Sequence, residues 1–110
     1  MRVPNAERAF IDVSKWRDYA LNPMHRVGGH KGRLFAMLLD MNINDTEALQ
    51  QILLNIIQTQ EAMLGELDEF GQRYVIDFML TWQGRQATVR SAWIIRPDEH
   101  FLRLVTCYPL

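Results

Sequence analysis

The stretch Arg73–Trp82, which reads RYVIDFMLTW, is rich in apolar side chains and carries its internal polar side chains, Asp77 and Thr81, in a single phase of an extended chain. Ile76, Phe78 and Leu80 fall on one side of an extended chain, and Asp77 falls on the other. A period of two over this length predicts a β-strand with one face in the core and the other face open.

Turn residues on both sides of this stretch separate it from further segments of the same period. Gly71 and Gly84 permit the positive φ that tight turns need, and Pro97-Asp98 opens a loop. The predicted strands cover residues 61–67, 73–82, 86–95 and 102–108. The second half of the chain is therefore expected to form an antiparallel sheet of about four strands.

Before residue 60 the apolar positions recur instead at helical spacing. The predicted helices cover residues 12–20, 30–41 and 46–59. Asn22-Pro23 ends the first of them, because the residue before a proline is pushed out of the α region. A length of 110 residues is typical of one domain. We expect a single domain over residues 1–110, of the α+β class, with about three N-terminal helices packed on the C-terminal antiparallel sheet.

Strand alternation assigns a core and an open face to this sheet. The expected core contains Phe35, Leu38, Leu53, Ile56, Ile76, Phe78, Val89, Trp93, Ile95, Val105 and Cys107. The expected open face contains Asp77, Thr88, Arg90, Thr106 and Tyr108, with Leu102 and Leu104 on the same side.

Composition excludes several classes of protein. Twelve basic and thirteen acidic residues leave a net charge of -1, so no overall positive field attracts nucleic acid. No apolar run is long enough to span a bilayer, and the N-terminus lacks a secretory signal, which predicts a cytoplasmic protein without membrane contact. The single cysteine, Cys107, is expected to be a buried small hydrophobe. No His or Cys pair has zinc-ligand spacing, and we expect neither a metal nor another cofactor.

The segment Gly28–Arg33 combines glycines with basic residues at a predicted helix start. Gly29 permits close approach of a ligand, the helix N-terminus offers N–H groups to an anion, and His30, Lys31 and Arg33 add charge or a titratable proton. The pattern predicts a phosphate-binding turn, although it is not a P-loop. The alternative is a loop that enters a helix through a solvated basic turn.

A second polar group lies on the predicted strands. Arg90 can fork onto phosphate oxygens, and the hydroxyls of Thr88 and Ser91 beside it add donors. Thr106 and Tyr108 supply hydroxyls that could orient a phosphate or stabilise developing charge. The alternatives are a cross-strand ion pair between Arg90 and Asp77, and ordinary strand propensity for Thr106 and Tyr108.

Several segments together resemble one uncharacterised bacterial domain family over nearly the whole chain. They are Pro4–Ala6, Leu21–Pro23, Gly29–Lys31, Glu69–Tyr74, Ala87–Ile95 and Leu104–Tyr108. Members of that family are small proteins or C-terminal parts of larger secreted toxins. The order of helices and sheet is similar to that of the barnase, EndoU, colicin and RelE-like ribonucleases.

This resemblance implies where a site would lie. His30 and Lys31 correspond to the pair at the helix start, and Arg90, Ser91, Thr106 and Tyr108 correspond to the polar set on the sheet. The family usually has alanine where this chain has Gly32, which leaves the geometry of the helix start less certain to match. In the ribonuclease group a metal is not needed.

The resulting hypothesis is a metal-independent ribonuclease toxin. His30 would act as general base or acid, Lys31 and Arg90 would hold the phosphate, and Thr106 and Tyr108 would orient it or protonate the leaving oxygen. Gly29, Arg33, Thr88 and Ser91 would complete phosphate and RNA binding.

Two alternatives stay open beside this hypothesis. One is an antitoxin, immunity or adaptor protein that binds a protein through the open sheet face. The other is a protein that binds a phosphate ligand without cleaving it. The expected partners are RNA, a cognate antitoxin or immunity protein, and a second copy of the chain as a homodimer.

Overall fold

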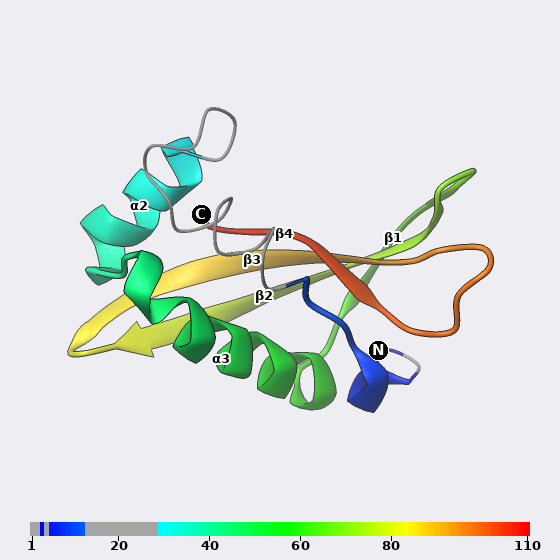
Figure 1. Cartoon of the computed structure of the whole chain (residues 1–110), viewed down its shortest axis with the longest axis horizontal. Helices are drawn as coiled ribbons and strands as arrows, with labels where there is room; N and C mark the ends of the chain where they lie inside the picture. The colour runs from blue at the N-terminus through cyan, green and yellow to red at the C-terminus, as the bar shows by residue number, and fades with distance from the viewer. Residues whose placement is uncertain (1–2, 4, 13–28) are drawn as a thin grey trace.

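A four-stranded antiparallel sheet forms the second half of the molecule (Figure 1). The computed structural model describes residues 3, 5–12 and 29–110, with residues 29–31 described by their backbone alone. The strands are β1 (Met63–Asp68), β2 (Gly71–Trp82), β3 (Arg85–Ile95) and β4 (Arg103–Pro109), in the spatial order β1-β2-β3-β4. The predicted sheet and the α+β class are confirmed.

The described part of the first half contains two α-helices and two short 3₁₀ turns. They are η1 (Ala6–Arg8), α2 (Gly29–Leu39), η2 (Ile43–Asp45) and α3 (Thr46–Thr59). Three helices were predicted, and apart from Asp12 the first of them, 12–20, lies outside the described residues. No α-helix of the described part is long and apolar enough to cross a membrane.

Tight turns fix the register of the sheet. Gln83 and Gly84 both have positive φ, of 47° and 83°, as a two-residue hairpin turn between right-twisted strands requires. The register that follows places Asp77 opposite Arg90 and Tyr74 opposite Trp93. At the other end of β2, Gly71 has a φ of 133°, and a Cβ there would lie 2.2 Å from the carbonyl oxygen of Ile95.

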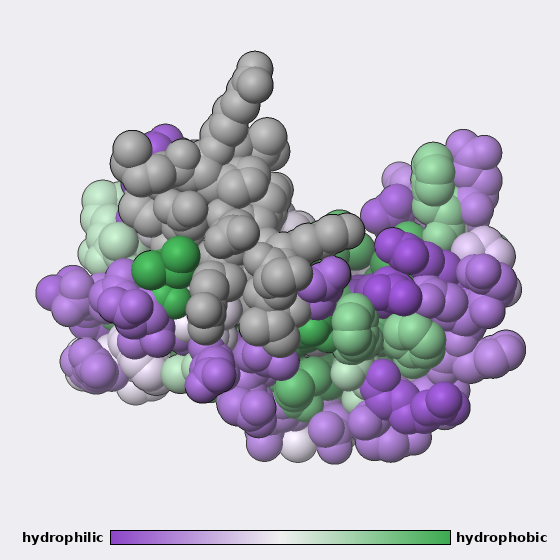
Figure 2. Space-filling view, in the orientation of Figure 1, coloured by the Kyte–Doolittle hydropathy of each residue, from purple (hydrophilic) through white to green (hydrophobic). Residues whose placement is uncertain are grey.

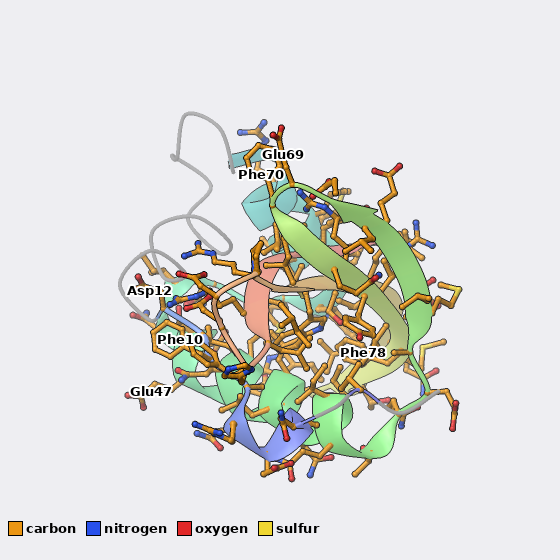
Figure 3. All side chains as sticks on the ribbon, turned by 90° about the vertical axis from the view of Figure 1, so that its right-hand side faces the viewer. Phe10, Asp12, Glu47, Glu69, Phe70 and Phe78 are labelled. Atoms are coloured by element: carbon orange, nitrogen blue, oxygen red, sulfur yellow. The ribbon has the colours of Figure 1, made fainter. Side chains whose placement is uncertain are left out.

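The core lies on one face of the sheet. Ile76, Phe78, Val89 and Trp93 are buried on that face, with Ile95 half-buried beside them. α3 contributes Leu49, Leu53, Ile56 and Ile57, and α2 contributes Phe35 and Leu39. Figure 3 shows Phe78 pointing from the sheet into this core above α3. The predicted core is confirmed at most of its positions.

Leu38 was predicted in the core, and this was wrong. Its neighbour Leu39 is fully buried, whereas Leu38 is 37% exposed. Phe35 and Leu39 are four residues apart and so share one face of α2, from which Leu38 is turned by about 100°.

A β-bulge in β4 changes the expected faces of the last strand. Thr106 pairs with Ala92 but Leu104 pairs with Trp93, so Val105 is the extra residue. Val105 is therefore 47% exposed instead of buried, and Leu102 and Leu104 turn toward the core instead of the open face. Cys107, beyond the bulge, is buried as predicted.

The N-terminal segment runs beside the start of β4. The amide of Phe10 donates to the carbonyl of Leu102 at 2.7 Å, and the amide of Leu104 donates to the carbonyl of Phe10 at 3.1 Å. The guanidinium of Arg103 lies 5.0 Å from the ring centroid of Phe10 and donates to Glu99. This cluster ties the first described segment to the sheet.

Candidate functional site

The open face of the sheet carries a row of three polar side chains from β2, β3 and β4. The register pairs Asp77 with Arg90 and Arg90 with Tyr108, so their side chains lie side by side across the sheet. Arg90 forks onto Asp77, with Nε to Oδ1 at 2.8 Å and Nη2 to Oδ2 at 2.9 Å. The cross-strand pair considered from the sequence is therefore present.

The charges of this row stabilise each other. The hydrogen bond from Arg90 holds the pKa of Asp77 below its ordinary value, against the partial burial that would raise it. The same contact raises the pKa of Arg90, and a hydrogen bond from the guanidinium to Tyr108 adds to the increase. The side chain of Arg90 is 37% exposed, and that of Asp77 is 27% exposed. The row is thus ordered and still reached by solvent.

Two threonines extend the polar row along the open face. Thr106 precedes Tyr108 by two positions on β4, and Thr88 precedes Arg90 by two positions on β3. Side chains two apart on a regular strand share a face. The structure therefore places Arg90, Thr88, Thr106 and Tyr108 on one surface.

Ser91 does not belong to that surface, which corrects the placement expected from the sequence. Its side chain is fully buried, and its hydroxyl donates to the carbonyl of Ile76 at 3.0 Å. The same oxygen accepts the indole N–H of Trp93, also at 3.0 Å. Ser91 points to the core because it neighbours Arg90 in a strand and so faces the opposite side.

The helix that contains the basic turn packs on the strands that carry the polar row. α2 begins at Gly29, one residue before the predicted start, and contacts β4 and β3. Arg33 is exposed on this helix, and Gly32 is buried. The side chains of His30 and Lys31 lie outside the description, so their approach to Arg90 stays a prediction.

The two other histidines, His25 and His100, are not part of the proposed site. His100 is exposed, and its carbonyl accepts the side-chain amide of Asn5 at 2.9 Å. His25 lies outside the described residues. Across residues 3, 5–12 and 29–110, no three His, Cys, Asp or Glu side chains are grouped so that they could hold a metal ion.

A groove that the sequence analysis did not identify lies at the other end of the open face. It has a volume of about 460 Å³ and is lined by Glu69, Phe70, Arg73, Ile94, Arg96, Pro97, Asp98 and Val105. Glu69 and Phe70 come from the β1–β2 turn, and Val105 is the bulge residue of β4. The phenylalanine in an otherwise polar turn was the one available signal.

Comparisons with known proteins place the chain in a family and show a related fold. A family model described as a domain of unknown function (DUF6883) matches residues 2–110. The comparison with curated proteins gave no match. A solved structure described as a contact-dependent growth inhibition toxin and immunity protein complex from Klebsiella pneumoniae 342 has a similar chain, with a TM-score of 0.69 at 14% identity. The match covers 91% of this chain and 98% of that one, and at this identity it shows the fold alone.

Proposed function

The chain belongs to the DUF6883 family, and from that premise and the open sheet face we propose that it is the toxin of a toxin and immunity pair. Its activity in this proposal is endonucleolytic cleavage of RNA by general acid and base catalysis. The observation that carries the proposal is the contact between Arg90 and Tyr108 on a solvent-exposed face, with Thr88 and Thr106 beside it.

The arginine of the row keeps donors for a phosphate. A guanidinium has five N–H groups in a fixed fork. Asp77 accepts hydrogen bonds from two of those of Arg90. A phosphate can therefore approach the remaining edge without breaking the pair. Asp77 acts as a positioning residue, because a forked carboxylate fixes the plane of the guanidinium.

The neutral Asp77 and Arg90 pair does not supply a net positive charge. That charge comes in this proposal from Lys31 and Arg33 on α2, which packs on β3 and β4. Because Phe35 and Leu39 of α2 pack in the core, this proposal requires the start of α2 to reach around the edge strand β4. A phosphate held there would meet both the N–H groups of a helix N-terminus and the fork of Arg90.

The reaction removes one proton from the attacking oxygen and delivers one proton to the leaving oxygen. His30, as general base, takes the proton of a ribose 2′-hydroxyl, and that oxygen attacks the adjacent phosphorus. The bond from phosphorus to the 5′-oxygen breaks, and the leaving oxygen takes a proton from Tyr108 or from the protonated His30. The products are a 2′,3′-cyclic phosphate and a 5′-hydroxyl. Lys31 and Arg90 stabilise the charge that develops on the phosphate.

The similarity of the fold to a chain of a toxin and immunity complex supports a role in such a pair, and it does not distinguish the toxin from the immunity protein. The Asp77 and Arg90 contact also has the geometry of a purely structural cross-strand ion pair. A structural pair needs no catalytic role, which favours the second candidate function. In that candidate the chain is a non-enzymatic immunity or antitoxin protein that binds its partner through the open face.

Induced expression in bacteria separates the two functions. We expect the parent chain to arrest growth and to fragment cellular RNA, leaving cyclic phosphate ends. His30→Ala and Arg90→Ala should each abolish both effects, and Thr81→Ala, on the same face but away from the row, should leave them unchanged. The thermal midpoint of Arg90→Ala should fall only a little, because its pair with Asp77 is partly exposed. The thermal midpoint of each variant shows whether it is folded.

Two outcomes would contradict the toxin proposal. Growth arrest that persists in folded His30→Ala and Arg90→Ala variants would remove these residues from the site. A parent chain that causes no arrest, and that protects cells when it is expressed with its neighbouring gene, would instead establish the immunity function.

A further inference from the structure

The β1–β2 hairpin extends beyond the helices at one end of the molecule (Figure 1). Figure 3 shows Glu69 and Phe70 at its tip, pointing away from the core. Within the described part of the chain, β1 pairs with β2 on one side and forms the edge of the sheet on the other. An exposed edge strand offers unpaired backbone groups to another chain.

Apolar side chains gather on this hairpin instead of being scattered. Leu64 and Leu67, 60% and 75% exposed, lie opposite Tyr74 and Gln72 and so share one face of the hairpin, with Phe70, 63% exposed, at its turn. Met63, 53% exposed, lies opposite Val75 and faces the other side. Single exposed apolar residues are ordinary on a protein surface, whereas a contiguous group marks an interaction site.

The groove beneath the hairpin tip is acidic at its rim. Arg73 pairs with Asp68 at 3.4 Å, and Arg96 lies 3.7 Å from Glu99, which Arg103 also contacts at 2.7 Å. The carboxylates around the groove outnumber these three arginines: they belong to Glu66, Asp68, Glu69, Asp98 and Glu99. Glu69 and Asp98 also line it, and Glu66 lies on the adjoining strand. Figure 2 shows the hairpin as a largely hydrophilic arm with apolar patches.

This combination of features selects one kind of occupant. The surplus of carboxylates repels phosphate, so an RNA strand is disfavoured here. A second copy of the chain would bring the same acidic hairpin against this one, which is disfavoured for the same reason. A protein with Lys and Arg around an apolar side chain complements both the charge and the exposed Leu67 and Phe70.

We infer that the β1–β2 hairpin is a docking surface for a basic partner protein. The partner adds a strand to the free edge of β1 and places an apolar side chain in the groove beside Phe70. Its basic residues meet Glu66 and Glu69. Backbone pairing along β1 supplies affinity, and the groove supplies specificity.

The position of the groove gives this docking a consequence for the open face. Val105 lines the groove and directly precedes Thr106 of the polar row. A partner seated there extends over the approach to Thr106 and Tyr108. Inhibition of cleavage by this obstruction rests on the proposed function, whereas the docking itself does not.

Binding to the protein encoded by the neighbouring gene tests the inference. We expect a complex of the two purified proteins in which amide exchange slows in Met63–Asp68. Leu67→Glu and Phe70→Glu should each weaken binding by about 30-fold or more, as loss of a central apolar anchor does. Glu69→Lys should weaken it less, and the difference should shrink in high salt.

A matched control lies elsewhere on the surface. Met37 is 66% exposed on α2, and Met37→Glu should leave binding unchanged. All four positions are exposed, so unchanged thermal midpoints are expected and verify that the variants fold.

Several results would overturn the inference. One is that the protein encoded by the neighbouring gene does not bind. Another is that binding slows amide exchange only at residues outside β1. A third is that Leu67→Glu and Phe70→Glu both bind with the affinity of the parent. Loss of RNA binding in Phe70→Glu with partner binding intact would assign the groove to RNA. A dimer of the parent chain that Leu67→Glu dissociates would assign the edge to a second copy. A chain that binds its partner as expected but cleaves no RNA would refute the proposed function and support this inference.

Discussion

The two faces of β3 treat neighbouring polar residues in opposite ways. Ser91 is fully buried, and its single oxygen serves both the carbonyl of Ile76 and the indole of Trp93. Arg90, the residue before it, is 37% exposed and forks onto Asp77 at the surface. Both residues are hydrogen-bonded, yet only one of them can be reached by a ligand.

The difference teaches that a hydrogen bond has a different meaning on each face. In the core, an unpaired indole or hydroxyl would bear a large desolvation penalty, so the bonds of Ser91 are a condition of folding. At the surface, water can replace a lost partner, so the bonds of Arg90 add little stability and leave the side chain available for function. Substitutions on the two faces should therefore affect different properties of the protein.

The largest effect is expected at Trp93, the largest fully buried side chain among the described residues. Trp93→Ala removes its packing and leaves a cavity, which should lower the free energy of unfolding by about 3–5 kcal/mol. Met79→Ala, on the open face of the sheet, should change it by about 0.5 kcal/mol or less. Urea denaturation of both variants measures the contrast. Similar losses of unfolding free energy in the two variants would mean that the open face is packed against another part of the protein and is not exposed to solvent.

A smaller effect is expected at Ser91, where no large volume is lost. Ser91→Ala leaves the buried Nε1 of Trp93 without its acceptor, which should cost about 1–3 kcal/mol of unfolding free energy. In the proposed function, RNA cleavage by this variant at a temperature where it is folded should equal that of the parent. Loss of cleavage with unchanged stability would return Ser91 to the site and break the contrast between the faces.

The sequence predicted the regular parts of the fold, and the errors fall where local geometry departs from a fixed period. Alternation correctly separated Asp77 and Arg90 from Phe78 and Val89, because β2 and β3 pair without a register shift. It misplaced Val105, Leu102 and Leu104, since a bulge adds one residue to β4 and reverses the faces of the residues that precede it. The apolar pattern changes phase between Leu104 and Val105, which is compatible with a bulge there, but alternation alone does not decide which of the two phases faces the core.

The sequence indicated the types of residue in the site, but it did not indicate correctly which of them share one surface. Grouping Ser91 with Arg90 by sequence proximity ignored that adjacent strand residues face apart. The pairing of Arg90 with Asp77 was foreseeable as one alternative, because charge pairs across neighbouring strands are favourable. The groove could not be foreseen, since Phe70 and Val105 meet there only through the twist of the sheet and the bulge.

The smallest effect is expected at Asp77, and acid titration can isolate it. The hydrogen bond from Arg90 holds the folded-state pKa of Asp77 below its ordinary value of 3.8. A depressed carboxyl pKa contributes stability that is fully present above the unfolded value and is lost as pH falls through the folded one. Asp77→Asn should therefore cost at most about 1 kcal/mol near neutral pH, because the pair is partly exposed.

The difference in unfolding free energy between the parent and Asp77→Asn should be constant from about pH 7 to about pH 5 and shrink below about pH 4. Asp68 and Glu99 also have lowered pKa values through their arginine and backbone contacts, but they are present in both proteins and cancel in the difference. Urea denaturation at each pH measures it. A difference that stays constant into strong acid would show that the contact with Arg90 does not stabilise the ionised form of Asp77. If the difference shrinks as expected while cleavage is impaired at neutral pH, Asp77 positions Arg90 for function more than it stabilises the sheet, as the contrast between the faces requires.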